Sequence, residues 1–317
     1  MNRKRKQHAA SLILLVGCFA STFAGDLEPP VPPGTPTMKP LHELEPRRPI
    51  YAEMLPLTIT DAGSSWYLAE SITTGGAGIT VDADDVTIDL MGFTLEGGTG
   101  VGIHDVRTTY PYTRNVTVRN GTVKGWADQG IRLSRESTIV NVRAVYNDGT
   151  GIEVGHYSLV IGSIAEANFT HGIVAAGRTV VRDCVATDNS ENGIWADSSV
   201  IVNCVADNNG RSGIRVDHSC LVTDNEVRGN SLLSTNDYAG IWVKGDTNRV
   251  EANLVAGNKN GLTIDGDFNV VVRNSAQINA IDNFRVGAGA TANMIGAIQT
   301  SLTSAGPWDN LCIGTCP

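Results

Sequence analysis

Two tryptophans and one arginine have the types and spacing of a ligand-binding surface. Trp195, Arg215 and Trp242 each follow the isoleucine of a Gly-Ile pair, in three successive copies of a repeat. Indole rings offer flat apolar faces that can stack on sugar rings, and a guanidinium can hold a carboxylate through two parallel hydrogen bonds. If these side chains lie in a row on one surface, we expect them to form a groove for a sugar chain.

Carboxylates occupy the position two residues further along the same repeats. Asp197, Asp217 and Asp265 belong to this set, with Lys244 between the last two. Asp197 and Asp217 come from adjacent repeats, and adjacent strands lie about 5 Å apart, which suits a catalytic carboxylate pair or a Ca2+ site. Lys244 or Arg215 could act as the base of a lyase. A solvated surface column, partly balanced by Lys244, is the structural alternative.

The elements that would position these residues come from a repeat of 20 to 28 residues. Its clearest marker is a Gly-Ile pair, with Leu or Phe in some copies, whose second residues are Ile79, Ile103, Ile131, Ile152, Ile173, Ile194, Ile214, Ile241, Leu262 and Phe284. An asparagine column moves in step, at Asn147, Asn168, Asn189, Asn209, Asn230, Asn258 and Asn279. A fixed period of this length is typical of a solenoid, and neither the leucine-rich frame nor a 3.6-residue period is present.

Further columns divide each repeat into three short strands. An apolar column is followed two residues later by residues that tolerate a left-handed backbone, namely Asn141, Gly162, Asp183, Asn203 and Asp224. We therefore predict a corner at this column, with one strand before it, one after it and a third at the Gly-Ile pair. Stacked in this way, the chain is predicted to be an all-β, single-stranded, right-handed parallel β-helix of about 9–10 coils.

The same columns resemble those of secreted bacterial proteins with right-handed parallel β-helix repeats, of the pectin-lyase superfold. The resemblance covers residues 76–286, where the segment 85–93 is similar to the usual first coil. The stem at 36–47 and the ending at 306–310 are also similar to secreted members. The resemblance implies the fold and leaves the activity open, because this superfold contains lyases, hydrolases, epimerases and adhesins.

The first 56 residues are expected to lie outside the solenoid. Residues 1–24 combine a basic start, a short apolar run and small residues at Ala20 and Ala24, which predicts a secretory signal. The segment ending at Cys18 also fits a lipobox, so a lipid anchor on that cysteine stays open. Residues 25–56 hold nine of the twelve prolines and are predicted to form a linker or stem. The β-helix is expected over 57–286, with an N-terminal cap at 57–75 and a C-terminal cap or tail at 287–317.

Charge and hydropathy narrow the range of partners. The net charge is −9, and removal of the signal takes away four basic residues, which leaves 20 − 33 = −13. No basic stretch follows the signal, so we expect no nucleic acid partner. The apolar run of the signal is too short for a transmembrane anchor, and we expect a monomer that is secreted or attached to the cell surface.

The cysteines are predicted to play structural roles. Cys184 and Cys204 occupy one inward column and should stay reduced, because a bridge between neighbouring parallel strands fits disulfide geometry poorly. Cys312 and Cys316 are predicted to close a small loop. An internal amide ladder is expected at Asn225, Asn253 and Asn274.

Three functions remain open from the sequence. The first is binding of an extracellular polysaccharide through Trp195, Arg215, Trp242 and Asp265. The second is a polysaccharide lyase or glycoside hydrolase that uses Asp197, Asp217 or Lys244, and the third is a structural or adhesin-like surface spacer. The segment 230–240 is six residues longer than its equivalents, so it could instead cover both tryptophans.

Overall fold

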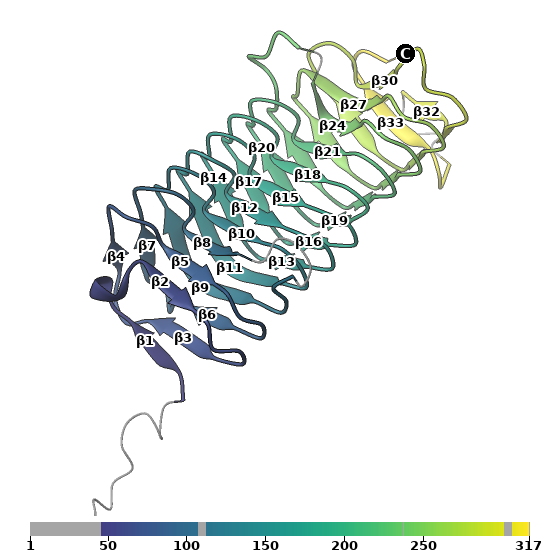
Figure 1. Cartoon of the computed structure of the whole chain (residues 1–317). Helices are drawn as coiled ribbons and strands as arrows, with labels where there is room; N and C mark the ends of the chain where they lie inside the picture. The colour runs from purple at the N-terminus through teal and green to yellow at the C-terminus, as the bar shows by residue number, and fades with distance from the viewer. Residues whose placement is uncertain (1–45, 107–111, 237, 301–305, 317) are drawn as a thin grey trace, which may run out of the picture. The chain divides into compact units, whose positions relative to one another are not determined.

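Strands of about three residues alternate with tight turns along the described part of the chain (Figure 1). The computed structural model describes residues 46–106, 112–236, 238–300 and 306–316. The predicted signal at 1–24 and most of the predicted linker lie outside the described residues. The strands coil into one continuous right-handed parallel β-helix, as the repeat predicts.

One sheet takes a single strand from each coil. Its 11 strands pair in parallel and contain the Gly-Ile column. They are β2 (Leu57–Ile59), β5 (Ile79–Val81), β8 (Ile103–Asp105), β10 (Ile131–Leu133), β12 (Ile152–Val154), β15 (Ile173–Ala175), β18 (Ile194–Ala196), β21 (Ile214–Val216), β24 (Ala239–Val243), β27 (Asn260–Ile264) and β30 (Phe284–Val286). In most of these strands the first and third residues are buried and the middle one faces outward.

The other two strands of each coil form a 22-stranded sheet that bends at the predicted corner. The strands before the corner are β1 (Arg48–Ile50), β3 (Ser65–Leu68), β6 (Thr87–Asp89), β13 (Leu159–Ile161), β16 (Val180–Arg182), β19 (Val200–Val202), β22 (Leu221–Thr223), β25 (Arg249–Glu251), β28 (Val270–Val272) and β31 (Met294–Ile295). Those after it are β4 (Ile72–Thr73), β7 (Thr94–Glu96), β14 (Ile164–Glu166), β17 (Val185–Thr187), β20 (Val205–Asp207), β23 (Glu226–Arg228), β26 (Leu254–Ala256), β29 (Ser275–Gln277), β32 (Ile298–Gln299) and β33 (Asn310–Ile313). Two strands run through the corner and join both parts, β9 (Thr117–Lys124) and β11 (Thr138–Val145).

The solenoid has about 12 turns, more than the 9–10 expected. The additional turns lie at its ends, where the Gly-Ile marker is absent. Strand β1 falls within the segment expected to be a linker and pairs with β3, and β31, β32 and β33 extend the sheet beyond residue 286. A one-turn 3-10 helix, η1 (Ala52–Met54), connects β1 to β2. Among the described residues, no helix is long and apolar enough to cross a membrane.

The predicted corner residues are confirmed in the left-handed conformation. Their φ angles are 53° at Asn141, 57° at Gly162 and Asp183, 53° at Asn203 and 58° at Asp224. Two further left-handed columns close the other turns of the coil, and their members include Tyr146, Ala167, Asp188 and Asn208 in one and Tyr157, Arg178, Ser198 and Ser219 in the other. Because these columns are not restricted to Asn, Asp and Gly, their composition gives no corner signal.

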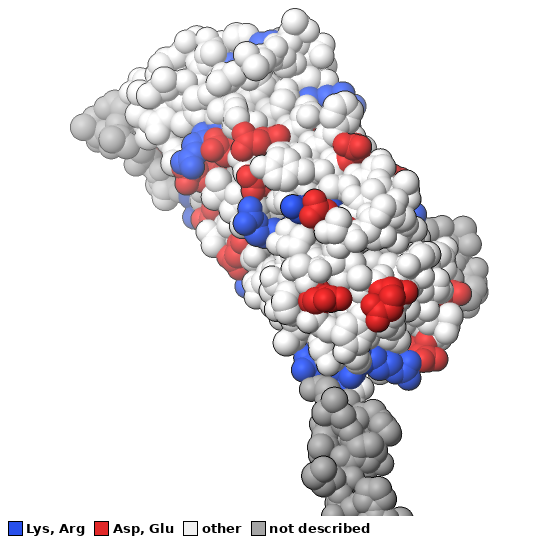
Figure 2. Space-filling view, turned by 90° about the vertical axis from the view of Figure 1, so that its left-hand side faces the viewer, with Lys and Arg blue, Asp and Glu red and all other residues white. Residues whose placement is uncertain are grey.

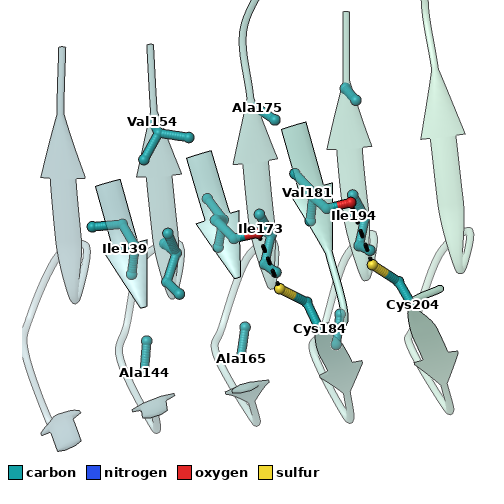
Figure 3. Close-up of a cluster of buried hydrophobic side chains, with 14 of the residues drawn as sticks. Ile139, Ala144, Val154, Ala165, Ile173, Ala175, Val181, Cys184, Ile194 and Cys204 are labelled. Atoms are coloured by element: carbon teal, nitrogen blue, oxygen red, sulfur yellow. Dashed lines mark hydrogen bonds between the residues drawn. The ribbon is translucent and has the colours of Figure 1, made fainter. Parts of the chain in front are cut away.

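The interior is a stack of small and branched apolar side chains (Figure 3). Cys184 and Cys204 are buried free thiols, as predicted, and their Sγ atoms donate to the carbonyls of Val160 and Val181 in the preceding coil, each at 3.6 Å. Cys312 and Cys316 form the predicted disulfide.

Asparagine ladders complete the interior. Asn225 donates through its side chain to Asn253, and Asn253 to Asn274, each at 2.9 Å, which confirms the predicted amide ladder. The asparagine marker column forms a second such ladder, as between Asn189 and Asn209 at 3.0 Å. The amides of Asn189, Asn225 and Asn253 each have their partner in the next coil, which helps to fix the stacking register of the outward columns.

Candidate functional site on the outer face of the 11-stranded sheet

The predicted row of Trp195, Arg215 and Trp242 is present on the outer face of the 11-stranded sheet. Trp195 in β18 pairs in register with Arg215 in β21, which pairs with Trp242 in β24. The guanidinium carbon of Arg215 lies 4.6 Å from the ring centroid of Trp195 and 5.6 Å from that of Trp242. The three side chains thus form one cation–π stack, here called the Trp195–Trp242 stack.

Carboxylates fix the orientation of this stack. The indole Nε1 of Trp195 donates to Oδ2 of Asp217 at 2.8 Å, and that of Trp242 donates to Oδ2 of Asp265 at 2.7 Å. Arg215 also donates to Oδ1 of Asp217, from Nη2 at 3.1 Å. With only 18% of the Arg215 side chain and 21% of the Asp217 side chain exposed, the guanidinium is already neutralised. It separates and supports the indoles instead of offering a free charge.

The long segment 230–240 covers the stack only in part. Tyr238 packs edge-on against Trp242 with ring centroids 5.6 Å apart, and His171 packs likewise against Trp195 at 5.1 Å. Both indoles nevertheless remain partly exposed. Burial lowers the pKa of His171, although Glu191, 3.1 Å from its Nε2, favours the protonated form. The tryptophans therefore have fixed edges and partly accessible faces.

The aspartate pair expected beside the stack lines a small cavity. Asp197 and Asp217 contribute to a volume of about 130 Å3 together with Trp195. Asp197 accepts a hydrogen bond from the backbone N–H of His218 at 3.1 Å, whereas Lys244 lies one coil further on, with Nζ 5.6 Å from the ring of Trp242. The structure thus brings the two aspartates to one cavity and places the lysine outside its lining.

This pair fits a Ca2+ ion poorly. Asp217 already accepts hydrogen bonds from Trp195 and Arg215. The part of the chain that the structure describes contains no group of three His, Cys, Asp or Glu residues able to hold a metal. Two carboxylates, one of them engaged, fall short of the six to eight oxygen ligands that Ca2+ takes.

A larger cavity, outside the predicted site, lies further toward the N-terminus on the same face. Its volume is about 590 Å3. The residues that line it are Tyr112, Arg132, Leu133, Ser134, Arg135, Glu153, Val154, Gly155, His156, Tyr157, Val174 and Ala176. It shares Val174 and Ala176 with the small cavity, so the two hollows adjoin along the sheet. We call it the arginine cavity.

The charged groups of the arginine cavity are partly withdrawn from water. Arg132 in β10 pairs in register with Glu153 in β12. Burial raises the pKa of the Glu153 carboxyl, with Arg132 opposing that shift. Burial also lowers the pKa of His104, in the coil before Arg132, and the nearby guanidinium adds to this effect. The two neighbours of Arg132 in the outward column, His104 and Glu153, are therefore both influenced by its charge.

A signal for this cavity is present in the sequence, one and two positions beyond the carboxylate column. Arg135 and His156 occupy the first of these positions in adjacent repeats, and Tyr157 and Arg178 occupy the second. Basic and aromatic residues in consecutive coils are the same kind of pattern that identified Trp195 and Trp242. They lie in a turn, however, and strand alternation predicts nothing about side-chain directions there.

Comparison with known proteins supports the architecture. A family model described as the right-handed beta helix region matches residues 99–255. The fold of the described residues is thus a right-handed parallel β-helix, and the family model covers its central coils. None of the curated proteins matches its sequence.

Several solved structures share the fold of this β-helix protein. The Dettilon tailspike protein is similar at 15% identity and a TM-score of 0.63, over 80% of this chain and 59% of the tailspike. The A-module of the mannuronan C-5 epimerase AlgE4 of Azotobacter vinelandii is similar at 16% identity and a TM-score of 0.51, over 80% of this chain and 82% of the module. The receptor binding domain of the Siphovirus 9NA tailspike is similar at 11% identity and a TM-score of 0.54, over 77% of this chain and 53% of that domain. The chain thus spans a little more than half the length of the two tailspike chains, and the likeness establishes the fold.

Proposed function

We propose that this β-helix protein binds an extracellular polysaccharide along the outer face of the 11-stranded sheet, with Trp195 and Trp242 as its sugar-stacking residues. The Trp195–Trp242 stack carries this proposal. Two partly exposed indoles two coils apart stand about 9–10 Å from each other at the spacing of paired strands. Each is held by an aspartate, so little side-chain entropy remains to be lost when a sugar stacks on it.

The surroundings of the stack favour an extended ligand. The small cavity and the arginine cavity continue from Trp195 along the same face, so a polymer could follow the solenoid axis over several coils. Proteins of the same fold include a tailspike receptor binding domain and a mannuronan C-5 epimerase. Secretion or surface attachment, which residues 1–24 predict, would bring this face into contact with such a polymer.

Alanine substitution of each tryptophan tests the binding proposal. Trp195→Ala and Trp242→Ala should each weaken binding of the responding polysaccharide by about 1–3 kcal/mol, the range of aromatic hot spots. Binding would be measured by affinity electrophoresis over a panel of neutral and anionic polysaccharides, followed by calorimetry.

A tryptophan on the other sheet provides the matched control. Trp308 is 58% exposed and lies beside β28 and β31 of the 22-stranded sheet, so Trp308→Ala should leave glycan affinity unchanged. Equal losses in all three variants, or none in any, would contradict the assignment of the binding face.

Cleavage of the same polymer is a second candidate function, because Asp197 and Asp217 line one cavity next to Trp195. The test follows the release of unsaturated ends and of reducing ends from each polysaccharide that binds. Under this candidate, Asp197→Asn abolishes turnover and retains affinity. A wild-type protein that binds and releases neither kind of end is a binding module.

A further inference from the structure

Arg135 is held by aromatic rings within the arginine cavity. Its guanidinium carbon lies 4.9 Å from the ring centroid of Tyr112 and 5.3 Å from that of Tyr157. Tyr157 is itself fixed, because its hydroxyl accepts a hydrogen bond from Nη1 of Arg178 at 2.8 Å. A planar guanidinium held by such contacts is pre-oriented for bidentate recognition of an anion.

No carboxylate neutralises the two arginines of this cavity. Neither Arg132 nor Arg135 forms an ion pair with any residue that the structure describes. The Nε atoms of both are buried without a hydrogen-bond partner among those residues. Glu136, next to Arg135 in sequence, lies 4.0 Å from Arg114 instead. Arg215 has Asp217 two residues further along the chain. At the equivalent position after Arg132 there is the uncharged Ser134.

Unpaired cations are unexpected in so acidic a chain. The net charge is −9, and many other arginines contact a carboxylate, for example Arg143 with Glu166 at 3.0 Å and Arg211 with Glu191 at 2.7 Å. Figure 2 shows one face on which basic and acidic groups are interspersed, with no broad field of either sign. The arginine cavity therefore stands out as a local concentration of positive charge that Glu153 compensates only in part.

We propose that the arginine cavity is a second ligand site, which binds one carboxylate or sulfate group of a sugar ring through Arg132 and Arg135. The carboxylate of Glu153 balances only part of the charge of the two guanidinium groups. The positive charge that is left matches a single anionic group. The volume of about 590 Å3 admits a ring as well as its charged group, and Tyr112 offers aromatic surface for that ring. This inference rests on the proposed function for the choice of a sugar over other organic anions.

Three monosaccharides that differ only at carbon 6 test the charge requirement. Galacturonic acid carries a carboxylate there, galactose 6-sulfate a sulfate ester and galactose a hydroxyl. Binding to the full chain would be measured by saturation-transfer NMR titration. At least one of the two anions should bind, at least tenfold more tightly than galactose, and the anion that binds identifies the group recognised. Equal binding of all three, or binding of none, would overturn the proposal.

Substitution of the arginines tests the location. Arg135→Gln should weaken binding of the anion at least tenfold, and Arg132→Gln should do the same if Arg135→Gln does not fold. Arg143→Gln makes the same charge change on the 22-stranded sheet and should have no effect. Unchanged affinity in a folded Arg135→Gln or Arg132→Gln protein would refute this site. Failure of the polysaccharide proposal looks different, because no polymer would then bind although the monosaccharide still does.

Discussion

Two arginines on the outer face of this solenoid are stacked on aromatic rings, and they differ in their counter-charge. Arg215 lies between two indoles and donates to Asp217. Arg135 lies against two tyrosines and has no carboxylate partner among the described residues. The first therefore forms a neutral, rigid platform, and the second retains its positive charge. Aromatic stacking alone does not make an arginine available to an anion; the neighbouring acid decides whether it is.

This difference divides recognition between two parts of one face. The Trp195–Trp242 stack offers ring faces, whereas the arginine cavity offers charge. Arg135 follows β10, and Trp195 lies three coils further on in β18, about 14 Å along the axis at the usual strand spacing. An oligosaccharide of a few residues could reach both. Under the two proposals, affinity comes mainly from the stack and the preference for acidic sugars from the cavity.

The largest expected effect comes from removing the counter-charge of Arg215. Asp217→Asn takes away the carboxylate that accepts from both Arg215 and Trp195. It should lower the free energy of unfolding by about 1–3 kcal/mol, because a mostly buried guanidinium loses its partner. It should also make Arg215 resemble Arg135, so that anionic sugars bind with added affinity that falls as salt rises. Denaturant titration and calorimetry at two ionic strengths measure both effects.

Asp207→Asn is the control for that change. Asp207 lies 3.5 Å from Arg228 on the 22-stranded sheet, where both side chains are more exposed. Its loss should cost less than about 1 kcal/mol and leave binding unaffected. Equal destabilisation by both substitutions would show that Asp217 is an ordinary surface partner and that the two stacked arginines do not differ in the way proposed.

A smaller effect is expected from removing the aromatic edge that covers Trp242. Tyr238→Ala deletes a T-shaped contact with ring centroids 5.6 Å apart, which should lower the unfolding free energy by about 0.5–1.5 kcal/mol. Galacturonic acid binding in the arginine cavity should not change, since Tyr238 does not line it. A loss of that binding would mean that the two regions are coupled. The measurements are a thermal melt and the same NMR titration.

The sequence predicts the stack more completely than the cavity, for a physical reason. Trp195, Arg215 and Trp242 lie within strands, where alternation fixes which side chains face outward. Arg135 and Tyr157 lie in a turn, and the left-handed column there contains Tyr157 and Arg178, which carry no turn signature. The coverage of Trp242 by Tyr238 depends on a long irregular segment, whose path no periodicity encodes. The sequence does not predict the first turns as full coils, because β1 lies in the proline-rich segment and β2 lacks the Gly-Ile marker.

The smallest expected effect is a pH dependence of anion binding in the arginine cavity. On one side Glu153 faces Arg132 in β10 and Asp128 in the turn before β10. On the other side it pairs with the uncharged Val174 in β15, and His156 lines the same cavity. Because burial raises the pKa of Glu153, its carboxylate takes up a proton at a higher pH than an exposed glutamate does. Protonation removes the one negative charge that lines the cavity.

Anion binding should therefore strengthen as the pH falls below 7, by roughly two- to fivefold once Glu153 is protonated, the effect of one partly screened charge. Glu153→Gln should bind the anion more tightly than the wild type at pH 7, and this advantage should shrink as the pH falls. A wild-type affinity for galacturonic acid that weakens as the pH falls would contradict the role given to Glu153, since protonation of this carboxylate removes negative charge from the cavity.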